Sequence, residues 1–72
     1  MKYNTGNWVE VTVRREGAPE SAFRGKIIEA TPDYAVAECR TPSGLMRFTM
    51  SDDTFGHIWF RRLQGSDFRR RR

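Results

Sequence analysis

The segment Trp8-Val9-Glu10-Val11-Thr12-Val13-Arg14 decides the fold class of this chain. Valines occupy every second position, and the positions between them carry Trp8 and polar or charged residues. Successive side chains of a strand point to opposite faces of a sheet, so this alternation predicts a half-buried β-strand. The rest of the sequence has to supply the strands with which this one pairs.

Four further segments have the character of short strands, namely residues 22–30, 34–40, 45–51 and 58–63. The adjacent Ile27 and Ile28 break the alternation and predict a β-bulge, where Gly25 relieves the crowding of the bend. Turns with proline, glycine or aspartate separate the segments. Residues 52–57 resemble one helical turn before the last strand, with Ser51 or Asp52 as its cap.

Five short strands, tight connections and one helical turn before the last strand resemble the plan of small SH3-like or Sm-like barrels. The resemblance is one of architecture alone, and it implies an all-β domain over residues 1–64. We expect a five-stranded antiparallel barrel or a strongly curled sheet. Residues 65–72 offer only Phe68 for burial and end in four consecutive arginines, which predicts a disordered arginine-rich tail.

The apolar phase of each strand defines a predicted core. Its members are Val9, Val11, Val13, Phe23, Ile27, Ala35, Ala37, Met46, Phe48, Ile58 and Phe60. Cys39 falls on the same face as the two alanines, which predicts a buried and inert thiol. The opposite phase of the last strand places Trp59, Arg61 and Leu63 outward.

Cysteine content and hydropathy bear on the compartment. One cysteine forms no intrachain disulfide, so the chain lacks the cross-links that staple small secreted domains, and a reducing cytoplasm fits best. The first residues contain no apolar segment of the signal-peptide kind, and no apolar run approaches the length that spans a membrane. We therefore expect a cytoplasmic chain without a membrane partner.

Catalysis has little support in this sequence. Cys39 and His57 are the only thiol and the only imidazole, and a nucleophile pair of this kind needs a third orienting group and a pocket. Asp52, Asp53 and His57 are metal-ligand types, but adjacent carboxylates point in different directions, and a helix cap explains their position. We expect no enzymatic activity, no metal and no other cofactor.

The formal charge of +4 is unevenly distributed. Residues 65–72 supply +3 of it, and the remaining body has nine basic and eight acidic residues. Basic residues recur on the predicted strands, whereas the predicted connections hold Glu16, Glu20, Asp33, Asp52 and Asp53. This distribution predicts a basic barrel wall with acidic loops.

The outward phase of the strands carries the candidate binding residues. They are Trp8, Arg14, Arg24, Lys26, Arg47, Trp59 and Arg61. A phosphate backbone needs positive charge along its path, and unpaired bases stack on flat aromatic rings. The combination predicts a non-enzymatic DNA-binding or RNA-binding module, and the arginine tail serves either as extra phosphate contacts or as a solubilising end.

Protein recognition is the alternative function. Trp, Tyr, Met and Arg are enriched at the energetic centres of protein interfaces, and a small barrel with an open edge strand can accept a partner strand or pair with itself. A small accessory factor of a phage or mobile element that binds a host protein fits the same features. The sequence leaves both functions open.

Overall fold

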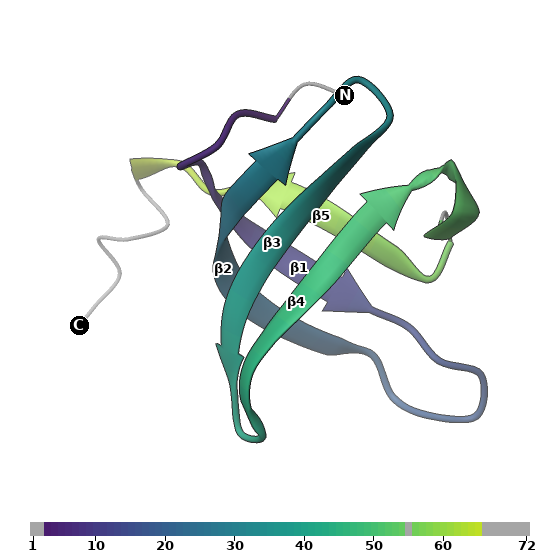
Figure 1. Ribbon diagram of the computed structural model, residues 1–72. Coiled ribbons are helices and arrows are strands. Elements are labelled where there is room, and N and C mark those ends of the chain that lie inside the picture. The colour runs from purple at the N-terminus through teal and green to yellow at the C-terminus, as the bar shows by residue number, and fades with distance from the viewer. Residues whose placement is uncertain (1–2, 55, 66–72) are drawn as a thin grey trace.

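The computed structural model describes residues 3–54 and 56–65 (Figure 1). The described residues form β1 (Trp8–Val13), β2 (Ser21–Ala30), β3 (Tyr34–Thr41), β4 (Gly44–Ser51), the 3₁₀ helix η1 (Asp52–Thr54) and β5 (Ile58–Arg62). The all-β class, the five strands and the helical turn before the last strand are confirmed. In this part of the chain, no helix is long and apolar enough to cross a membrane.

The strands form one antiparallel sheet in the order β4-β3-β2-β1-β5, and β5 passes behind β3 and β4 in the view of Figure 1. Among the described residues, no backbone ladder joins β4 to β5, so the sheet is not closed into a barrel. The expectation of a closed barrel is wrong: β5 pairs with β1 on one side, and no described strand pairs with its other side or with the free side of β4. The curled sheet therefore keeps two edges, β4 and β5.

β1 lies between β2 and β5 and supplies the centre of the core. Its Val9 and Val11 are fully buried, and Val11 pairs with Phe23 of β2 and with Phe60 of β5. Tyr3 covers the same region from the N-terminal segment. Its ring packs edge-on against Phe60 with centroids 5.8 Å apart, and its hydroxyl donates to the Phe60 carbonyl at 2.9 Å.

Small side chains line the seam between β2 and β3. Gly25 pairs with Cys39, and Ile27 pairs with Ala37. A Cβ on Gly25 would lie 2.5 Å from the Glu38 carbonyl oxygen and would also collide with the Cys39 sulfur, so only glycine fits. The register shifts directly after Ile27, which confirms the predicted bulge.

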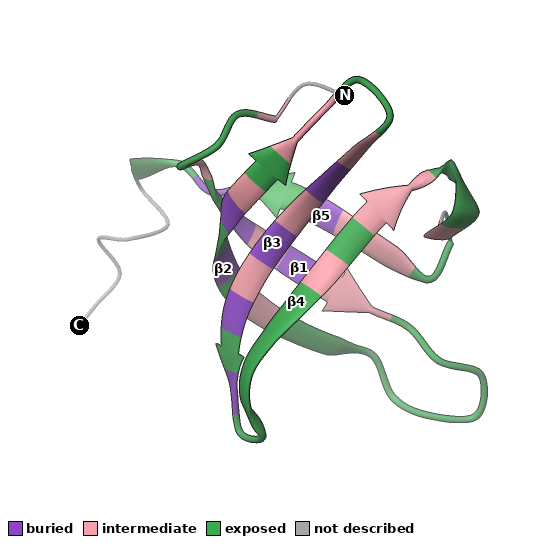
Figure 2. Ribbon diagram, in the orientation of Figure 1, coloured by how far each residue is buried: buried purple, intermediate pink, exposed green. Residues whose placement is uncertain are grey.

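Most of the predicted core is confirmed (Figure 2). The buried apolar residues are Val9, Val11, Ile27, Ala35, Ala37, Cys39, Phe60 and Leu63. Half-buried residues that pack against this cluster include Val13, Phe23, Phe48 and Ile58. The burial of Cys39 agrees with its predicted place beside the two alanines.

Two core predictions are wrong. Met46 is 41% exposed because it lies in the first half of β4, an edge of the open sheet. Leu63 is buried although it was expected outward. The alternation ends with β5 at Arg62, and the Leu63 N–H donates to the Trp8 carbonyl at 2.9 Å, which turns the chain inward.

Thr54 caps the helical turn η1. The Ser51 N–H donates to the Thr54 hydroxyl oxygen at 2.8 Å, and that hydroxyl donates to the Ser51 carbonyl at 3.1 Å. Gly56 leaves the turn at φ 89°, a backbone conformation that glycine adopts without steric cost. The Thr54 side chain therefore closes the turn on the backbone of Ser51, and capping by the Ser51 or Asp52 side chain stays a prediction.

The predicted boundary between a domain over residues 1–64 and a tail over 65–72 falls at the end of the described chain. Leu63 is the last buried residue of the described part, and Gly65 is the last residue described. Residues 66–72, which include Phe68 and the four arginines, lie outside the described residues. Disorder of the segment 65–72 stays a prediction.

Candidate nucleic-acid interface

The strand register brings the predicted site residues to one side of the sheet. Trp8 pairs with Lys26, and Glu10 pairs with both Arg24 and Arg61. These positions alternate with the buried valines of β1 and therefore point away from the core. We define the outer face by Trp8, Glu10, Arg24, Lys26, Glu38, Arg40, Arg47, Trp59 and Arg61.

Trp8 and Lys26 form the most accessible aromatic and cationic pair of the outer face. Trp8 is 45% exposed, and the Lys26 ammonium lies 5.0 Å from the centroid of its ring. Arg24 lies two residues before Lys26 on the same strand and is also exposed. An exposed ring beside two cations provides a stacking surface with positive charge along one strand.

Ion pairs interrupt the predicted basic wall. Glu10 and Glu38 lie on β1 and β3, so the expected separation of basic strands from acidic loops is only partial. Ion pairs among the described residues include Arg14–Glu20 at 2.6 Å, Arg47–Glu38 at 3.2 Å and Arg61–Glu10 at 3.4 Å. The strand pattern did not reveal them because a cross-strand pair depends on the register.

These ion pairs leave the arginines accessible. The side chains of Arg14, Arg47 and Arg61 are 57%, 69% and 54% exposed. Exposed pairs of this kind contribute about 0–1 kcal/mol each. A phosphate can therefore replace the glutamate as the partner of each guanidinium at small cost in folding free energy.

Trp59 is less available than predicted. It lies opposite Thr12 on the outer face, but its side chain is half-buried. The Arg14 guanidinium covers it, with the central carbon 5.1 Å from the ring centroid. The structure thus brings Trp59 and Arg14 together as a contact within the chain, and the more exposed ring of the face is Trp8, over which Lys26 lies.

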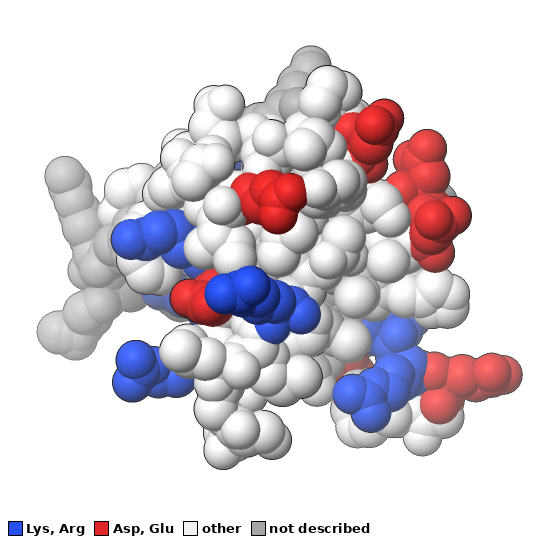
Figure 3. Space-filling view, viewed as in Figure 1, with Lys and Arg blue, Asp and Glu red and all other residues white. Residues whose placement is uncertain are grey.

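The described residues carry as many acidic as basic side chains, eight of each. The charges are only partly separated in space: Figure 3 shows acidic side chains gathered over the end of β4 and η1, and basic beside acidic side chains elsewhere. Asp33, Asp52 and Asp53 surround a shallow depression at this end together with Tyr34. The outer face is therefore the more basic part of a molecule with one acidic end.

A hydrogen bond joins β2 to β3 near the acidic end. The Tyr34 hydroxyl donates to the Glu29 carboxylate. This hydrogen bond, the negative charge of Glu29 and a smaller contribution from Asp33 raise the pKa of Tyr34 above its usual 10.0. The phenol therefore stays neutral and holds the carboxylate in place.

An apolar groove was missed by the sequence analysis. It has a volume of about 480 Å³, and its walls include Phe23, Phe48, Met46, Pro19 and Pro42. The rings of Phe23 and Phe48 stack with centroids 5.8 Å apart and planes 8° from parallel.

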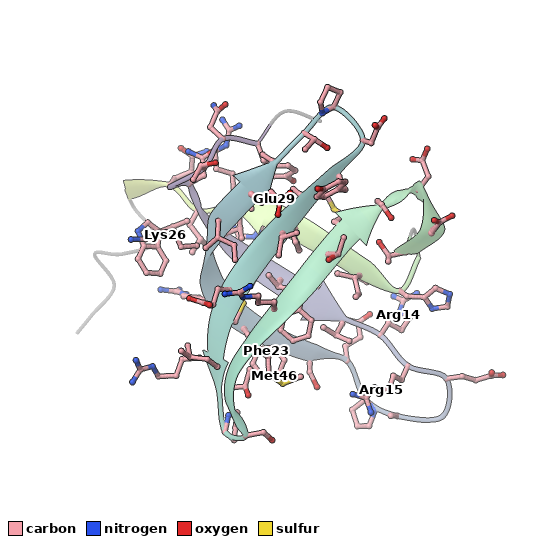
Figure 4. The ribbon with its side chains drawn as sticks, viewed as in Figure 1. Arg14, Arg15, Phe23, Lys26, Glu29 and Met46 are labelled. Atoms are coloured by element: carbon pink, nitrogen blue, oxygen red, sulfur yellow. The ribbon has the colours of Figure 1, made fainter. Side chains whose placement is uncertain are left out.

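The groove opens at the end of the sheet where the turn between β3 and β4 meets the loop between β1 and β2. Figure 4 shows Phe23 and Met46 together at this end, with Arg15 in the neighbouring loop and Lys26 on the other side of the molecule. The inward apolar phase of β4 was visible in the sequence, but it was assigned to a closed core.

The candidate catalytic and metal residues form no site within residues 3–54 and 56–65. Cys39 is buried beside Gly25, and burial raises the pKa of its thiol, which disfavours the reactive thiolate. His57 is exposed in the turn before β5. The described residues contain no group of three histidine, cysteine, aspartate or glutamate side chains arranged to hold a metal ion.

Comparisons with protein-family models, curated proteins and solved structures give no match to this chain. The geometry of the outer face and of the groove is therefore the basis for inferring the function of the chain.

Proposed function

We propose that the chain is a small module of SH3-like or Sm-like architecture that binds DNA or RNA through its outer face, without catalysis. The observation that carries the proposal is the exposed ring of Trp8 beside the ammonium of Lys26, with Arg24 on the same strand. The strand order and the single turn η1 before β5 support the architecture. A single free cysteine, Cys39, is compatible with a reducing cytoplasm as the compartment.

Single-stranded nucleic acid suits this face better than a duplex. A protein that binds single strands combines cations that follow the backbone with rings on which bases stack, and every base has a stacking face. Trp8 offers such a ring, and the exposed Arg24, Lys26, Arg47 and Arg61 offer cations on three strands. The arginines at 69–72 are a second source of phosphate contacts.

The decisive experiment measures binding of fluorescently labelled oligo(dT) and oligo(U) at about 50 and 200 mM salt, where phosphate contacts change affinity strongly. The double variant Arg24→Gln/Lys26→Gln should weaken binding and reduce the log–log salt slope by about 0.7 per lost contact with a single strand. Trp8→Ala should remove about 1–3 kcal/mol of stacking with little change in that slope.

Two controls separate the outer face from other sources of charge. Arg15→Gln removes one positive charge outside the outer face and should leave the slope nearly unchanged, whereas each charge lost from the outer face should change it. A chain ending at residue 64 removes the arginine tail and should retain part of the affinity. If affinity disappears with the tail while the outer-face variants bind as the wild type does, the outer face is not the binding surface.

Protein recognition is the second candidate, and the apolar groove favours it. Phe23, Phe48 and Met46 supply apolar walls of a groove that an apolar side chain of a protein partner can fill. A chain that binds neither oligonucleotide at either salt concentration would favour this candidate.

A further inference from the structure

β4 is an edge of the sheet with apolar side chains on both of its faces. Leu45 is 64% exposed and points to the outer side, whereas Met46 is 41% exposed and lines the groove. Within the described residues, no strand pairs with the free side of β4. An unpaired edge presents backbone N–H and C=O groups that can pair with another strand, and exposed apolar residues strengthen that pairing.

The two ends of β4 carry opposite charge. At its start, Arg40 of β3 pairs with Leu45, and Arg15 lies on the wall of the groove together with Met46. At its end, Asp52 and Asp53 follow directly in η1. Arg15, Arg40, Asp52 and Asp53 are exposed, and none of them forms an ion pair with another described residue.

We propose that β4 pairs antiparallel with β4 of a second copy of this chain, related by a two-fold axis. Antiparallel pairing brings the acidic end of each copy to the basic end of the other, so Asp52 and Asp53 face Arg15 and Arg40 twice. A parallel arrangement would place like charges together, which disfavours it. The inference goes beyond the proposed function and does not depend on it.

The strand itself identifies a second copy as the occupant. An unrelated peptide would need its own acidic and basic ends at the right separation, whereas a second β4 has them by symmetry. The pairing covers Leu45 and Met46 and buries the apolar rim of the groove. One strand pair is small for a stable dimer, so we expect association that increases with protein concentration and decreases with salt.

Sedimentation equilibrium of three chains without nucleic acid tests the pairing. The wild type should form dimers, whereas the acid-swapped variant Asp52→Lys/Asp53→Lys and the base-swapped variant Arg15→Glu/Arg40→Glu should each dimerise at least about tenfold more weakly. Each variant alone brings like charges together at both contacts. An equimolar mixture of the two variants should form a mixed dimer, because both contacts are again between opposite charges.

A third variant and a fold control complete the test. Leu45→Lys/Met46→Lys, made in the otherwise wild-type chain, places charge on the edge strand. It should dimerise more weakly than the wild type, because charged edges resist strand pairing. Circular dichroism of each variant is the control that shows whether its β-sheet is retained. A wild-type chain that stays monomeric at high concentration overturns the proposal. So does a mixture of the two folded swap variants that associates no better than either alone.

Discussion

The seam between β2 and β3 differs from the open side of the sheet at β4 in the size of its inner side chains. Gly25, Ala37 and Cys39 bring the backbones of the seam together and are all buried. On the open side, Phe48 is half-buried and Met46 is exposed, and a groove separates them from the loop between β1 and β2. In a sheet this small, the seam therefore supplies close packing, and the open side leaves apolar surface accessible.

The largest expected effect concerns Phe60, which is 6% exposed and packs against Val11 and Tyr3. Phe60→Ala should lower the free energy of unfolding by about 3–5 kcal/mol, the usual loss for a buried aromatic ring. Urea denaturation, monitored by tryptophan fluorescence, measures this loss of stability. A loss below about 1 kcal/mol would mean that β5 contributes little to the packed core.

Gly25→Ala tests the seam directly. The added methyl group meets the Glu38 carbonyl oxygen, a backbone atom that cannot rotate away, so we expect a loss of about 3 kcal/mol, near the upper end for overpacking. Gly65→Ala is the matched control, because a Cβ there has nothing within 4 Å. Equal stability of the two variants would show that β2 and β3 are not held closely together.

Phe48→Ala gives the corresponding measurement on the open side. Phe48 is half-buried and stacks on Phe23, so its removal should cost about 2 kcal/mol, below the range for a fully buried ring. Urea denaturation of Phe48→Ala and Phe60→Ala under the same conditions compares their free energies of unfolding. A loss as large as that of Phe60→Ala would mean that the groove is filled in solution and that the two sides pack alike.

The smallest expected effect on stability concerns the hydrogen bond beyond the bulge, in which the Tyr34 hydroxyl donates to the Glu29 carboxylate. This hydrogen bond is the first cause of the raised pKa of Tyr34, so Glu29→Ala should lower that pKa towards 10.0. The contact contributes stability below pH 10 and loses it as the pH rises through the raised pKa in the folded chain. Absorbance of tyrosinate during an alkaline titration checks the shift, and an unchanged titration curve would show that Glu29 does not hold the phenol.

The strands and most of the core could be predicted because they follow from alternation along the chain. Val9 and Val11 are buried as their spacing requires, and the bulge lies directly after Ile27. Closure of the sheet could not be predicted in this way. It depends on whether β4 and β5 exchange hydrogen bonds, and their absence leaves Met46 exposed.

The sequence predicted which side chains of the candidate site point outward, but it did not predict their contacts with other side chains of the chain. Alternation placed Trp8, Lys26 and Arg47 outward, as the register confirms. The pairing of Arg47 with Glu38, and the cover of Trp59 by Arg14, depend on which strands are neighbours and how they are aligned. Local sequence carries no signal for either contact.

Binding of nucleic acid to the outer face is best tested by an NMR titration of the ¹⁵N-labelled chain with a single-stranded oligonucleotide. We expect the largest chemical-shift changes at the Trp8 indole and at the amides of Arg24 and Lys26, while the amides of the groove residues Met46 and Phe48 change little. Changes confined to the groove or to residues 66–72, or no changes at all, would show that the outer face is not the binding surface.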